Sequence, residues 1–549
     1  MVPVTRLFFL VCLLVCGFQP NGWGQIGLAS KVSTPLSERE KVVHVLGRLG
    51  FGHSPESFQN ALDIGAEAWI KRQLESEIEL SPTLTGVLGQ FETLDLTPKE
   101  CREFIYMEIP DDATPEERRA RNALRNLPKR ELAQSVLLRA MLNERQIEEV
   151  LCDFWRNHFN VSFTKGGPAD ALIPDYESQV IRGNIWGKFP AMLKDSARHP
   201  AMLHYLDNYL SRKPPSKQEL AEVERKVRRR TGSRQRGEEA ASIAAQKGLN
   251  ENYARELLEL HTLGVDKFYK QKDVVAVAEA LTGWTADLGR NGTQNFVFNG
   301  GMHIYGDKRV LGRVIRSKAG EGQEEGEAIL NLLSSHRGTA DFVATKLVRY
   351  FVNDIPPPAL VRRVSATFSK TKGSIPEMIS AIVESKEFWA RENYRAKFKT
   401  PFEFVVSALR VTGAEVDSVR KITSTLQSMG QPTLHCDDPT GWYDTAESWL
   451  DPGVMALRWE FAEALASGKV EGVRIPDSFF SIIPSDLPPL LWQHHLTRAV
   501  LPGGAGERTR AALAAVTNDY LKGRSIPDLY DLGPRLLGLL LGSPEFQQQ

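Results

Sequence analysis

The chain has 549 residues, of which 42% are hydrophobic and 25% are charged, as in ordinary soluble globular proteins. Lys and Arg together number 68 and so do Asp and Glu, which gives a formal net charge of zero. No overall field therefore favours nucleic acid or an anionic membrane, and any electrostatic function must be local. At roughly 150 residues per domain, the length predicts about two to four lobes.

The first 24 residues are predicted to be a signal peptide. A single arginine precedes an apolar run at residues 7–18, which is too short to span a bilayer core of about 30 Å. Gly22 and Gly24 supply the small residues that a cleavage site needs. A lipoprotein signal that ends at Cys16 is less favoured, because the residue before Cys16 is bulky, and an uncleaved anchor is the other alternative. We expect export to the periplasm or outside the cell, and no transmembrane span in the mature chain.

Three cysteines remain in the mature chain, namely Cys101, Cys152 and Cys436. Three cysteines allow at most one internal disulfide and leave one thiol over, and the sequence does not determine which two would pair. Their spacing matches no zinc or redox motif. The commoner interpretation of each is a small buried apolar residue.

Helix-start signals recur along the chain. Thr97, Thr114 and Thr400 are each followed by Pro and, three residues after the Thr, by Glu. In this pattern Thr caps the free N–H groups, Pro occupies the first helical position, and Glu reaches back to the cap. Ser54 starts another helix without the Glu. The helix from Thr400 is predicted to end at Gly413.

The chain is predicted to be mainly α. Apolar residues between positions 132 and 159 recur at helical spacing, which predicts one long amphipathic helix or two in series. Strand signals are scarce, and the best lie at residues 295–314, where we predict a small β-hairpin. The mature chain is divided into an N-terminal helical region (25–210), an insertion (211–248), a central helical region (249–415) and a C-terminal helical region (416–549).

The insertion at 211–248 differs in composition from the rest of the chain. It carries Arg228, Arg229 and Arg230 in a row and has almost no large apolar residues. A stretch of this kind buries too little surface to offset its ordering entropy, so we expect a mobile, basic surface segment. Its functional interpretation is docking to an acidic glycan, and the commoner interpretation is a solvated loop.

The stretch from Asn250 to His261 is the strongest candidate for chemistry. Successive helical residues turn by about 100°, which places Asn250 and His261 in the middle of the predicted apolar face. Arg255 and Glu259, four apart on the other side, are a natural ion pair. In the functional interpretation His261 is an acid/base or metal ligand with Glu251 nearby. In the alternative, His261 and Asn250 are hydrogen-bonded and lock the helix into the core.

A second candidate is the pair Asn157 and His158. His158 points inward between Trp155 and Phe159, and such a site perturbs the pKa of a histidine in a way useful for proton transfer near neutral pH. Plain packing explains it equally well. Asp207 ends an apolar helix, where a carboxylate can bind metal or orient a histidine, or simply lie in a turn.

Further histidines extend the list to His303 on the predicted hairpin, His336 before a helix and His435 in a loop. Convergence of several histidines would make a divalent-metal site plausible, although no spacing here reproduces a known metal, phosphate-loop, dinucleotide or nucleophile-elbow motif. The predicted catalytic residues are His158, His261, Glu251, Asp207, Asn157 and Asn250. The predicted substrate-binding residues are Arg255, Trp284, His303 and Trp442, the tryptophans by stacking on sugar rings unless they are simply buried. The metal-ligand candidates are His158, His261 and His336.

The motifs resemble those of the bacterial family catalogued as domain of unknown function 1800. The matching stretches are 44–55 (HVLGRLGFGHSP), 153–161 (DFWRNHFNV), 201–208 (AMLHYLDN), 249–265 (LNENYARELLELHTLGV), 280–284 (ALTGW), 303–312, 336–352, 399–410, 441–449 and 543–547. The resemblance implies a helical, exported bacterial protein, and it brings no mechanism. Members are often encoded beside an exported sulfatase-like family, which implies such a partner. The insertion after Leu210 and the long acidic stretch at 317–327 depart from the family pattern.

Three functions remain open. The first is an exported enzyme that acts on a cell-surface or extracellular polysaccharide or its ester groups by His/carboxylate or metal-assisted chemistry, with its residues gathered in one pocket. The second is a non-catalytic binding or assembly partner of a sulfatase-like protein, with those residues scattered. The third is a protein that binds acidic glycan through the insertion. The first is placed narrowly ahead, because polar residues in an apolar helix face are costly unless they are used.

Overall fold

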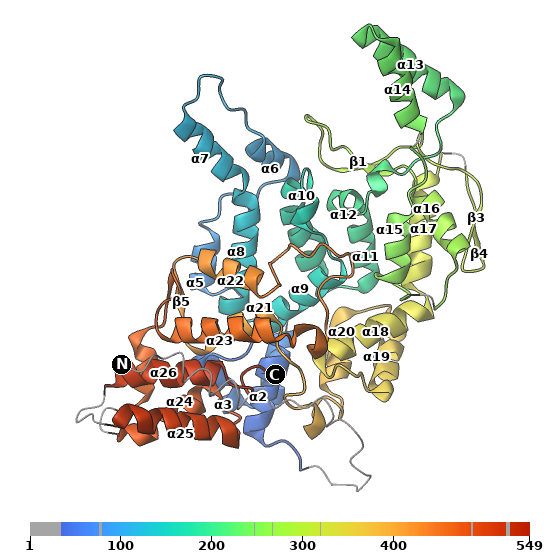
Figure 1. Cartoon of the computed structure of the whole chain (residues 1–549). Helices are drawn as coiled ribbons and strands as arrows, with labels where there is room; N and C mark the ends of the chain where they lie inside the picture. The colour runs from blue at the N-terminus through green and yellow to red at the C-terminus, as the bar shows by residue number, and fades with distance from the viewer. Residues whose placement is uncertain are drawn as a thin grey trace.

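The computed structural model describes residues 34–75, 79–245, 247–265, 267–318, 320–484, 487–522 and 528–549. The predicted signal peptide lies outside these residues. The described chain is mainly α, as predicted, with a few short two-stranded sheets (Figure 1). None of its helices combines the length and the apolar character needed to cross a membrane.

The N-terminal region is a succession of helices: α2 (Glu38–Arg48), α3 (Pro55–Ile64), α4 (Ala66–Leu74), α5 (Pro82–Leu88), α6 (Pro98–Ile105), α7 (Pro115–Arg125), α8 (Leu127–Leu142), α9 (Gln146–His158), α10 (Ala169–Asp175), α11 (Phe189–Arg198) and α12 (Pro200–Tyr205). The caps predicted at Thr97 and Thr114 are confirmed, each with its Glu bonded back to the cap. Ser54 also caps its helix, and Ser57 takes the place of the Glu. Residues 132–159 form two helices in series, because the chain leaves the helix at Asn143 and begins again at Gln146.

The insertion contains α13 (Lys217–Thr231) and α14 (Arg234–Ala245). The central region contains α15 (Asn252–Glu259), α16 (Gln271–Leu281), α17 (Gly322–Ser334), α18 (Arg337–Phe351), α19 (Pro358–Thr371), α20 (Ile375–Val383) and α21 (Pro401–Val411). Its strands are β1 (Trp284–Ala286), β2 (Phe296–Phe298), β3 (Lys308–Val310) and β4 (Arg313–Ile315). The predicted capping box at Thr400 is confirmed, and the helix that it starts ends just before Gly413, which has a φ of +60°.

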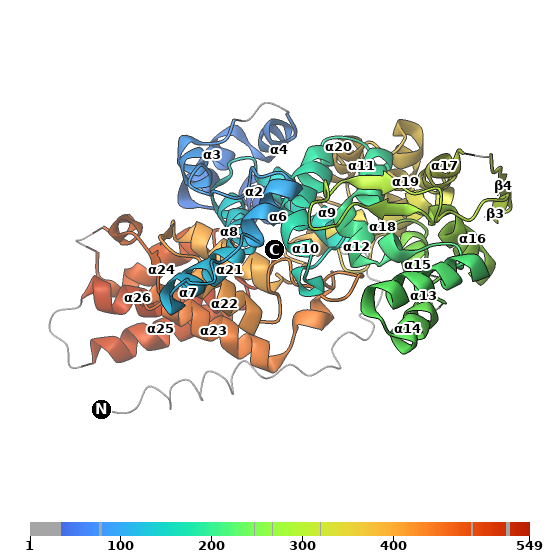
Figure 2. The ribbon, with the colours of Figure 1, turned by 90° about the horizontal axis from the view of Figure 1, so that it is seen from above.

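The C-terminal region contains α22 (Arg420–Ser428), α23 (Pro452–Ala466), α24 (Pro489–Val500), α25 (Glu507–Leu521) and α26 (Leu529–Leu541), with β5 (Glu415–Val416) paired to β6 (Val473–Arg474). One cluster of buried apolar side chains includes residues from Val42 in α2 to Phe546 after α26. The two ends of the described chain therefore share a core, and both lie on the lower side of the molecule in Figure 1. Figure 2 shows the same helices from above.

The β-hairpin predicted at 295–314 is wrong in its pairing. Phe296 in β2 pairs with Ala286 in β1, and Lys308 in β3 pairs with Ile315 in β4. The structure thus has two small hairpins at this place, one on each side of the loop at 299–307. The prediction joined the two apolar stretches to each other because it did not recognise Trp284–Ala286, at the end of a helical motif, as a strand.

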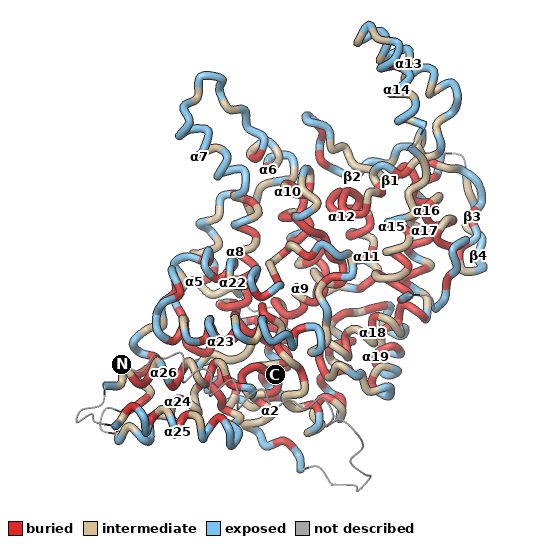
Figure 3. The backbone as a smooth tube through the Cα atoms, viewed as in Figure 1, coloured by how far each residue is buried: buried red, intermediate tan, exposed pale blue. Residues whose placement is uncertain are grey.

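The insertion contains a pair of helices, which its composition did not indicate. Ser216 and Glu219 form a capping box at the start of α13, and Gly232, with a φ of +67°, turns the chain into α14. Gly237 in α14 lies so close to Glu224 of α13 that an added Cβ would stand 2.8 Å from its carbonyl oxygen. Helix propensity, caps and this close contact stabilise the pair although α13 buries no residue. Figure 3 shows both helices projecting from the body and largely exposed.

The three cysteines, Cys101, Cys152 and Cys436, are buried and free, and no disulfide joins them. Burial raises the pKa of the Cys101 thiol to about 12 and that of the Cys436 thiol to about 11. These thiols therefore stay protonated at neutral pH and pack as small apolar groups, the commoner of the two interpretations.

Candidate functional site

The motif helix α15 is shorter than the sequence predicts. Asn250 lies before it, where its Oδ1 accepts the N–H of Asn252 at 2.9 Å, and His261 lies after its last residue, Glu259. Asn250 and His261 thus do not share one helical face. They stand at opposite ends of a helix of 8 residues, which is about 12 Å long.

His158 and His261 do come together, with ring centroids 6.3 Å apart. His158 Nε2 lies 3.2 Å from the carbonyl oxygen of His261, so this nitrogen carries the proton and donates it to that carbonyl. The rings of Trp155 and Phe159 contact His158 edge-on, as predicted. The two motifs that contain these histidines are therefore joined in the core.

Both histidines are held neutral. Burial, assisted by the charge of Lys346, lowers the pKa of His261 to about 3 and takes the pKa of His158 well below its usual range. A base this weak is poorly matched to proton transfer near neutral pH, where catalysis favours a pKa close to the working pH. The pKa of His158 is thus perturbed, as the sequence suggests, but it is lowered too far for proton transfer near neutral pH.

Asp207, Asn250, Glu251 and Arg255 lie near the other end of α15. Asp207 has a φ of +60° and forms an ion pair of 2.8 Å with Lys165, and Asn250 Nδ2 donates to its backbone oxygen at 3.4 Å. Glu251 and Arg255 are 3.3 Å apart. The expected ion pair between Arg255 and Glu259 is present at 3.5 Å. This group is a set of locally satisfied contacts, separate from the two histidines.

Asn157 holds the loop that contains Trp442. Its Nδ2 donates to the backbone oxygen of Trp442 at 2.8 Å, and its Oδ1 accepts the N–H of the same residue at 2.6 Å. The side chain thereby pairs with a backbone as a strand would. Trp442 is half-buried, with its ring 6.3 Å from that of Trp449. The geometry supports a role for Asn157 in fixing this loop.

The remaining predicted residues have packing partners. Trp284 is fully buried, and so is His303, whose Nε2 is 3.3 Å from Glu325 and whose Nδ1 is 2.7 Å from the backbone oxygen of Thr282. His336 caps α18, where its Nδ1 accepts the N–H of Gly338 at 3.0 Å. Substrate contact by Trp284 or His303 stays a prediction that their burial does not support. Within the described ranges, no three side chains of His, Cys, Asp or Glu gather as metal ligands would.

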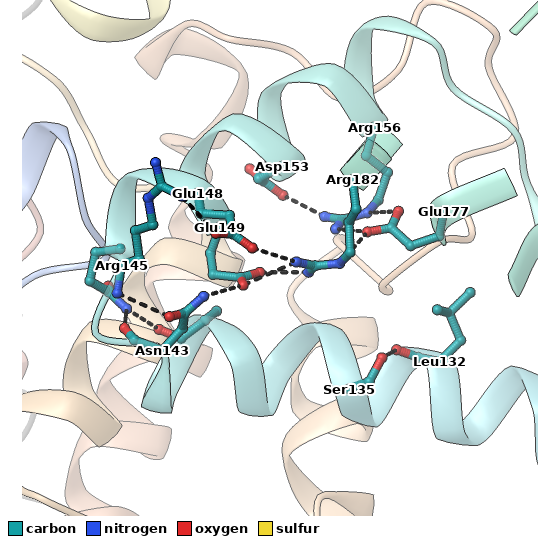
Figure 4. A network of polar contacts seen from close by, with 12 residues as sticks. Leu132, Ser135, Asn143, Arg145, Glu148, Glu149, Asp153, Arg156, Glu177 and Arg182 are labelled. Carbon is teal, nitrogen blue, oxygen red and sulfur yellow. Dashed lines mark hydrogen bonds and ion pairs between the residues drawn. The ribbon is translucent and has the colours of Figure 1, made fainter. Parts of the chain in front are cut away.

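A network of buried charges surrounds α9 (Figure 4). Arg156 contacts Glu177 with two bonds of 2.9 and 2.7 Å, and Arg182 contacts Glu149 with two of 3.1 and 2.6 Å. Asp153 stands beside Arg156 at 3.4 Å, and burial raises the pKa of its carboxyl group to about 6. Each guanidinium is paired with carboxylates in the fork geometry that stabilises such bonds. The network joins α9 to the segment at 176–182.

A cavity of about 50 Å³ lies where the two ends of the chain meet, and it contains a lysine beside a serine. Lys399 Nζ is 3.1 Å from Ser407 Oγ, and Ser407 Oγ in turn donates to the backbone oxygen of Phe404 at 3.0 Å. Both side chains are buried. Burial, assisted by the charges of Arg395 and Arg458 and opposed by that of Glu403, lowers the pKa of Lys399 to about 7.

Local structure fixes this pair. Ser407 lies on α21 two turns after the Thr400 cap, and Lys399 lies just before that cap, in a segment whose N–H groups bond to the chain end: Lys399 N donates to the oxygen of Gln547 at 2.8 Å. Gly52 approaches from the other side with a φ of +81°, and an added Cβ there would stand 3.0 Å from that of Ser407. Only glycine fits this conformation and this contact without strain.

Seven further polar residues line the same cavity, namely His44, His53, Tyr394, Arg395, Glu545, Gln548 and Gln549. His44 Nε2 lies 2.9 Å from the oxygen of Phe388, and His53 Nε2 lies 2.8 Å from that of Ala499. Burial lowers the pKa of His44 to about 3 and that of His53 to about 4, so both are neutral. Lys399 differs from both histidines, because its pKa lies near neutral pH.

The sequence prediction did not include Lys399 or Ser407. The signal that could have found them is the resemblance itself, because the stretches 44–55, 399–410 and 543–547 all supply residues to this cavity. A Ser and a Lys eight positions apart form no known motif, and only the packing of the chain ends shows that His44 and Phe546 surround them.

Comparison with known proteins identifies one family. A family model described as a protein of unknown function, DUF1800, matches residues 44–548. No curated protein and no solved structure matches the chain.

Proposed function

The chain belongs to the DUF1800 family, whose description names no activity, and we propose from its own geometry that it is an exported hydrolase of ester groups on a cell-surface or extracellular polysaccharide. Ser407 is the nucleophile and Lys399 is its general base. The single observation that carries the proposal is the contact of 3.1 Å between Lys399 Nζ and Ser407 Oγ inside a cavity.

The pKa of Lys399 suits this role. A lysine is a base only when it is neutral, and burial brings its pKa to about 7, so a large fraction is deprotonated near neutral pH. A serine within hydrogen-bond distance of such an amine reproduces the nucleophile–base relation of Ser–Lys hydrolases. In the structure Ser407 Oγ donates its proton to the oxygen of Phe404 and accepts from Nζ of Lys399. When Lys399 is neutral, rotation of the hydroxyl away from Phe404 turns this proton toward Nζ.

The reaction follows from these two groups. Ser407 Oγ attacks the ester carbonyl carbon while its proton moves to the neutral Nζ of Lys399. The bond between the carbonyl carbon and the alcohol oxygen then breaks, and the ammonium of Lys399 gives its proton to the leaving oxygen. Water attacks the acyl-serine in the same way, releases the carboxylic acid and restores both side chains.

This mechanism replaces the His/carboxylate or metal-assisted chemistry expected from the sequence. His158 and His261 have pKa values far below neutral, and Glu251 and Asp207 are paired with Arg255 and Lys165. The described residues gather no third ligand around the two imidazoles, so a divalent metal is less supported than the Ser–Lys pair. Export and a polysaccharide substrate rest on the apolar N-terminal run and the family resemblance.

Covalent labelling tests the proposal. The mature protein treated with a fluorophosphonate at pH 8 should be modified at Ser407, as located by peptide mass spectrometry, and Lys399→Met should slow the labelling by at least about tenfold. Ser135 is a matched control, because it is also buried in a helix and its Oγ donates to the backbone oxygen three residues earlier, at 2.8 Å. Among the described residues it has no lysine partner. Labelling of Ser135 and Ser407 to the same small extent would overturn the proposal.

A second candidate function, the binding of acidic glycan, has one observation in its favour. The turn between α13 and α14 carries exposed arginines on both sides, namely Arg228, Arg229, Arg230, Arg234 and Arg236. Among the described residues only Arg234 of these has a carboxylate within ion-pair distance, Glu238 at 2.8 Å. Unpaired guanidinium groups on a projecting arm suit carboxylate or sulfate groups of a polymer.

Retention on immobilised heparin tests this second function. Changing Arg228, Arg229 and Arg230 together to Gln should lower the salt concentration for elution, and changing Arg118, Arg119 and Arg121 on α7, another exposed helix of basic character, should change it little. Equal retention of both variants would overturn it. The remaining candidate function is that of a non-catalytic partner of an exported sulfatase-like protein. The family resemblance supports it, because members are often encoded beside such a protein, and co-purification of the two exported proteins would test it.

A further inference from the structure

We infer that the cavity beside Ser407 selects acetyl esters over longer acyl esters, and this inference rests on the hydrolase proposed above. The cavity has a volume of about 50 Å³. A water-sized group needs about 10–15 Å³ of such volume, so the space holds roughly three to five heavy atoms. That is the size of an acetyl group with its ester oxygens.

The walls of the cavity are apolar on several sides, and displacing their side chains costs free energy. Val43 of α2, Val411 of α21, Val500 of α24 and Phe546 line it, and all but Val43 are buried. They belong to four segments that share the main core. Close-packed side chains of this kind resist the insertion of further methylene groups, because the neighbours must leave their rotamers or shift the backbone.

Three residues that line the cavity each have a buried polar atom without a partner. The hydroxyl of Tyr394, Nδ1 of His44 and Oε1 of Gln549 make no hydrogen bond among the described residues. His44 Nε2 bonds to a carbonyl, so it carries the proton and Nδ1 is an acceptor. The residues around the cavity therefore offer one unused donor and two unused acceptors, an arrangement that a polar ligand would satisfy and that is costly without one.

The absence of a side chain at Gly503 leaves room for the unused donor, the hydroxyl of Tyr394. An added Cβ on Gly503 would collide with the hydroxyl of Tyr394 and with the guanidinium of Arg395, so glycine at 503 allows both groups to stand there. Arg395 has a φ of +54° and donates to the oxygen of Gly504 at 3.2 Å. Tyr394 and Arg395 are both lining residues of the cavity that contains Ser407.

These groups fit the two steps of acetyl transfer. The Tyr394 hydroxyl donates to the acetyl carbonyl oxygen as it gains negative charge during attack by Ser407, an interaction that strengthens in the transition state. His44 Nδ1 accepts a hydrogen bond from the water that later attacks the acetyl-serine, while Lys399 takes one proton of that water and returns it to Ser407 Oγ as the acyl bond breaks. The products are the free hydroxyl group of the substrate and acetic acid, so atoms and protons balance.

The test uses the mature chain and a series of p-nitrophenyl esters. We expect kcat/KM for the acetate to exceed that for the butyrate by at least about tenfold, since each methylene that a packed pocket rejects or accepts changes the rate by about 10- to 200-fold. Val43→Ala should enlarge the cavity and reduce this ratio toward one. Val42→Ala is the matched control, because Val42 is a buried neighbour that does not line the cavity, so it should leave the ratio unchanged.

Tyr394→Phe adds an independent readout. It should lower kcat for the acetate by about tenfold or more with little change in KM, because the lost donor acts mainly in the transition state. Butyrate hydrolysed as fast as acetate by the native chain would overturn the acetyl selectivity and leave the hydrolase standing. Absence of hydrolysis of either ester, together with absence of labelling at Ser407, would overturn both.

Discussion

Two regions of the molecule bury titratable side chains in different ways. In the motif region, His158 bonds to the backbone of His261, and aromatic rings enclose both. In the region where the chain ends meet, Lys399 contacts Ser407 beside a cavity that also contains unpartnered polar atoms. Burial shifts pKa values in both regions. In the second region, however, the pKa of the base Lys399 stays near neutral pH, and this base lies beside both the nucleophile Ser407 and a cavity. A buried polar residue is therefore a poor guide to chemistry until its partners and the neighbouring space are known.

The largest predicted effect is a loss of ester hydrolysis when the cavity region is changed but not when the motif region is changed. Lys399→Met should reduce ester hydrolysis by about a thousandfold or more, since single losses from a nucleophile–base unit have effects of that order. His261→Asn should leave hydrolysis within about threefold of the native rate after correction for folded fraction, because the imidazole is not part of the reaction. Lys397→Met is a matched control for loss of a buried lysine, since Lys397 pairs with Asp354 and does not line the cavity. A large loss in His261→Asn with unchanged folding would break the comparison.

A glycine gives the next largest effect. Gly52→Ala should destabilise the protein by about 2 kcal/mol and lower kcat, because the new methyl group meets Ser407 and the residue has a φ of +81°. Gly430→Ala, at a φ of +84° with nothing within 4 Å, carries the backbone strain alone. Chemical denaturation and steady-state kinetics of the two variants would separate strain from crowding. If both variants kept native kcat, Ser407 would not need its present position.

The sequence predicted the fold better than the site. Helix caps at Thr97, Thr114 and Thr400 were predictable, because they depend on residues three positions apart. The pairing of β1 with β2 was not, since it depends on a loop whose path the pattern does not specify.

The site was harder because its contacts are far apart in the chain. The sequence left open whether His158 and His261 converge, and the helix predicted from Asn250 to His261 is longer than the helix in the structure. The cavity at Ser407 joins residues near 44, 400 and 546. The spacing of residues within one segment does not indicate contacts between segments that are this far apart in the sequence. The order in the insertion was missed for a related reason, since the contact of Gly237 with Glu224 is invisible to composition.

A pH titration of stability addresses the motif region. The pKa of His261 is lowered in the folded state to about 3 from 6.5, so the unfolded chain binds a proton that the folded chain refuses between these values. Stability from this group is present above pH 6.5 and is lost as the pH falls, by about 1.4 kcal/mol per pH unit. His261→Phe should therefore flatten the fall in the free energy of unfolding between pH 6.5 and pH 4 by about that slope. An unchanged slope in urea denaturation would show that His261 is accessible to protons when folded.

The smallest effect tests the cavity through its electrostatics. Lys399 faces Glu403, which raises its pKa, and Arg395 and Arg458, which lower it, while the cavity histidines His44 and His53 are neutral. Activity requires the neutral amine, so kcat/KM should rise with pH with a midpoint of about 7. Glu403→Gln removes the raising charge and keeps a side chain that can still accept from the Thr400 cap. The midpoint should then move to lower pH, by less than about one unit, and the rate at pH 6 should increase. A gain of activity from the loss of a buried carboxylate is not expected of a structural role, and a midpoint that stayed fixed or moved upward would show that Lys399 is not the base.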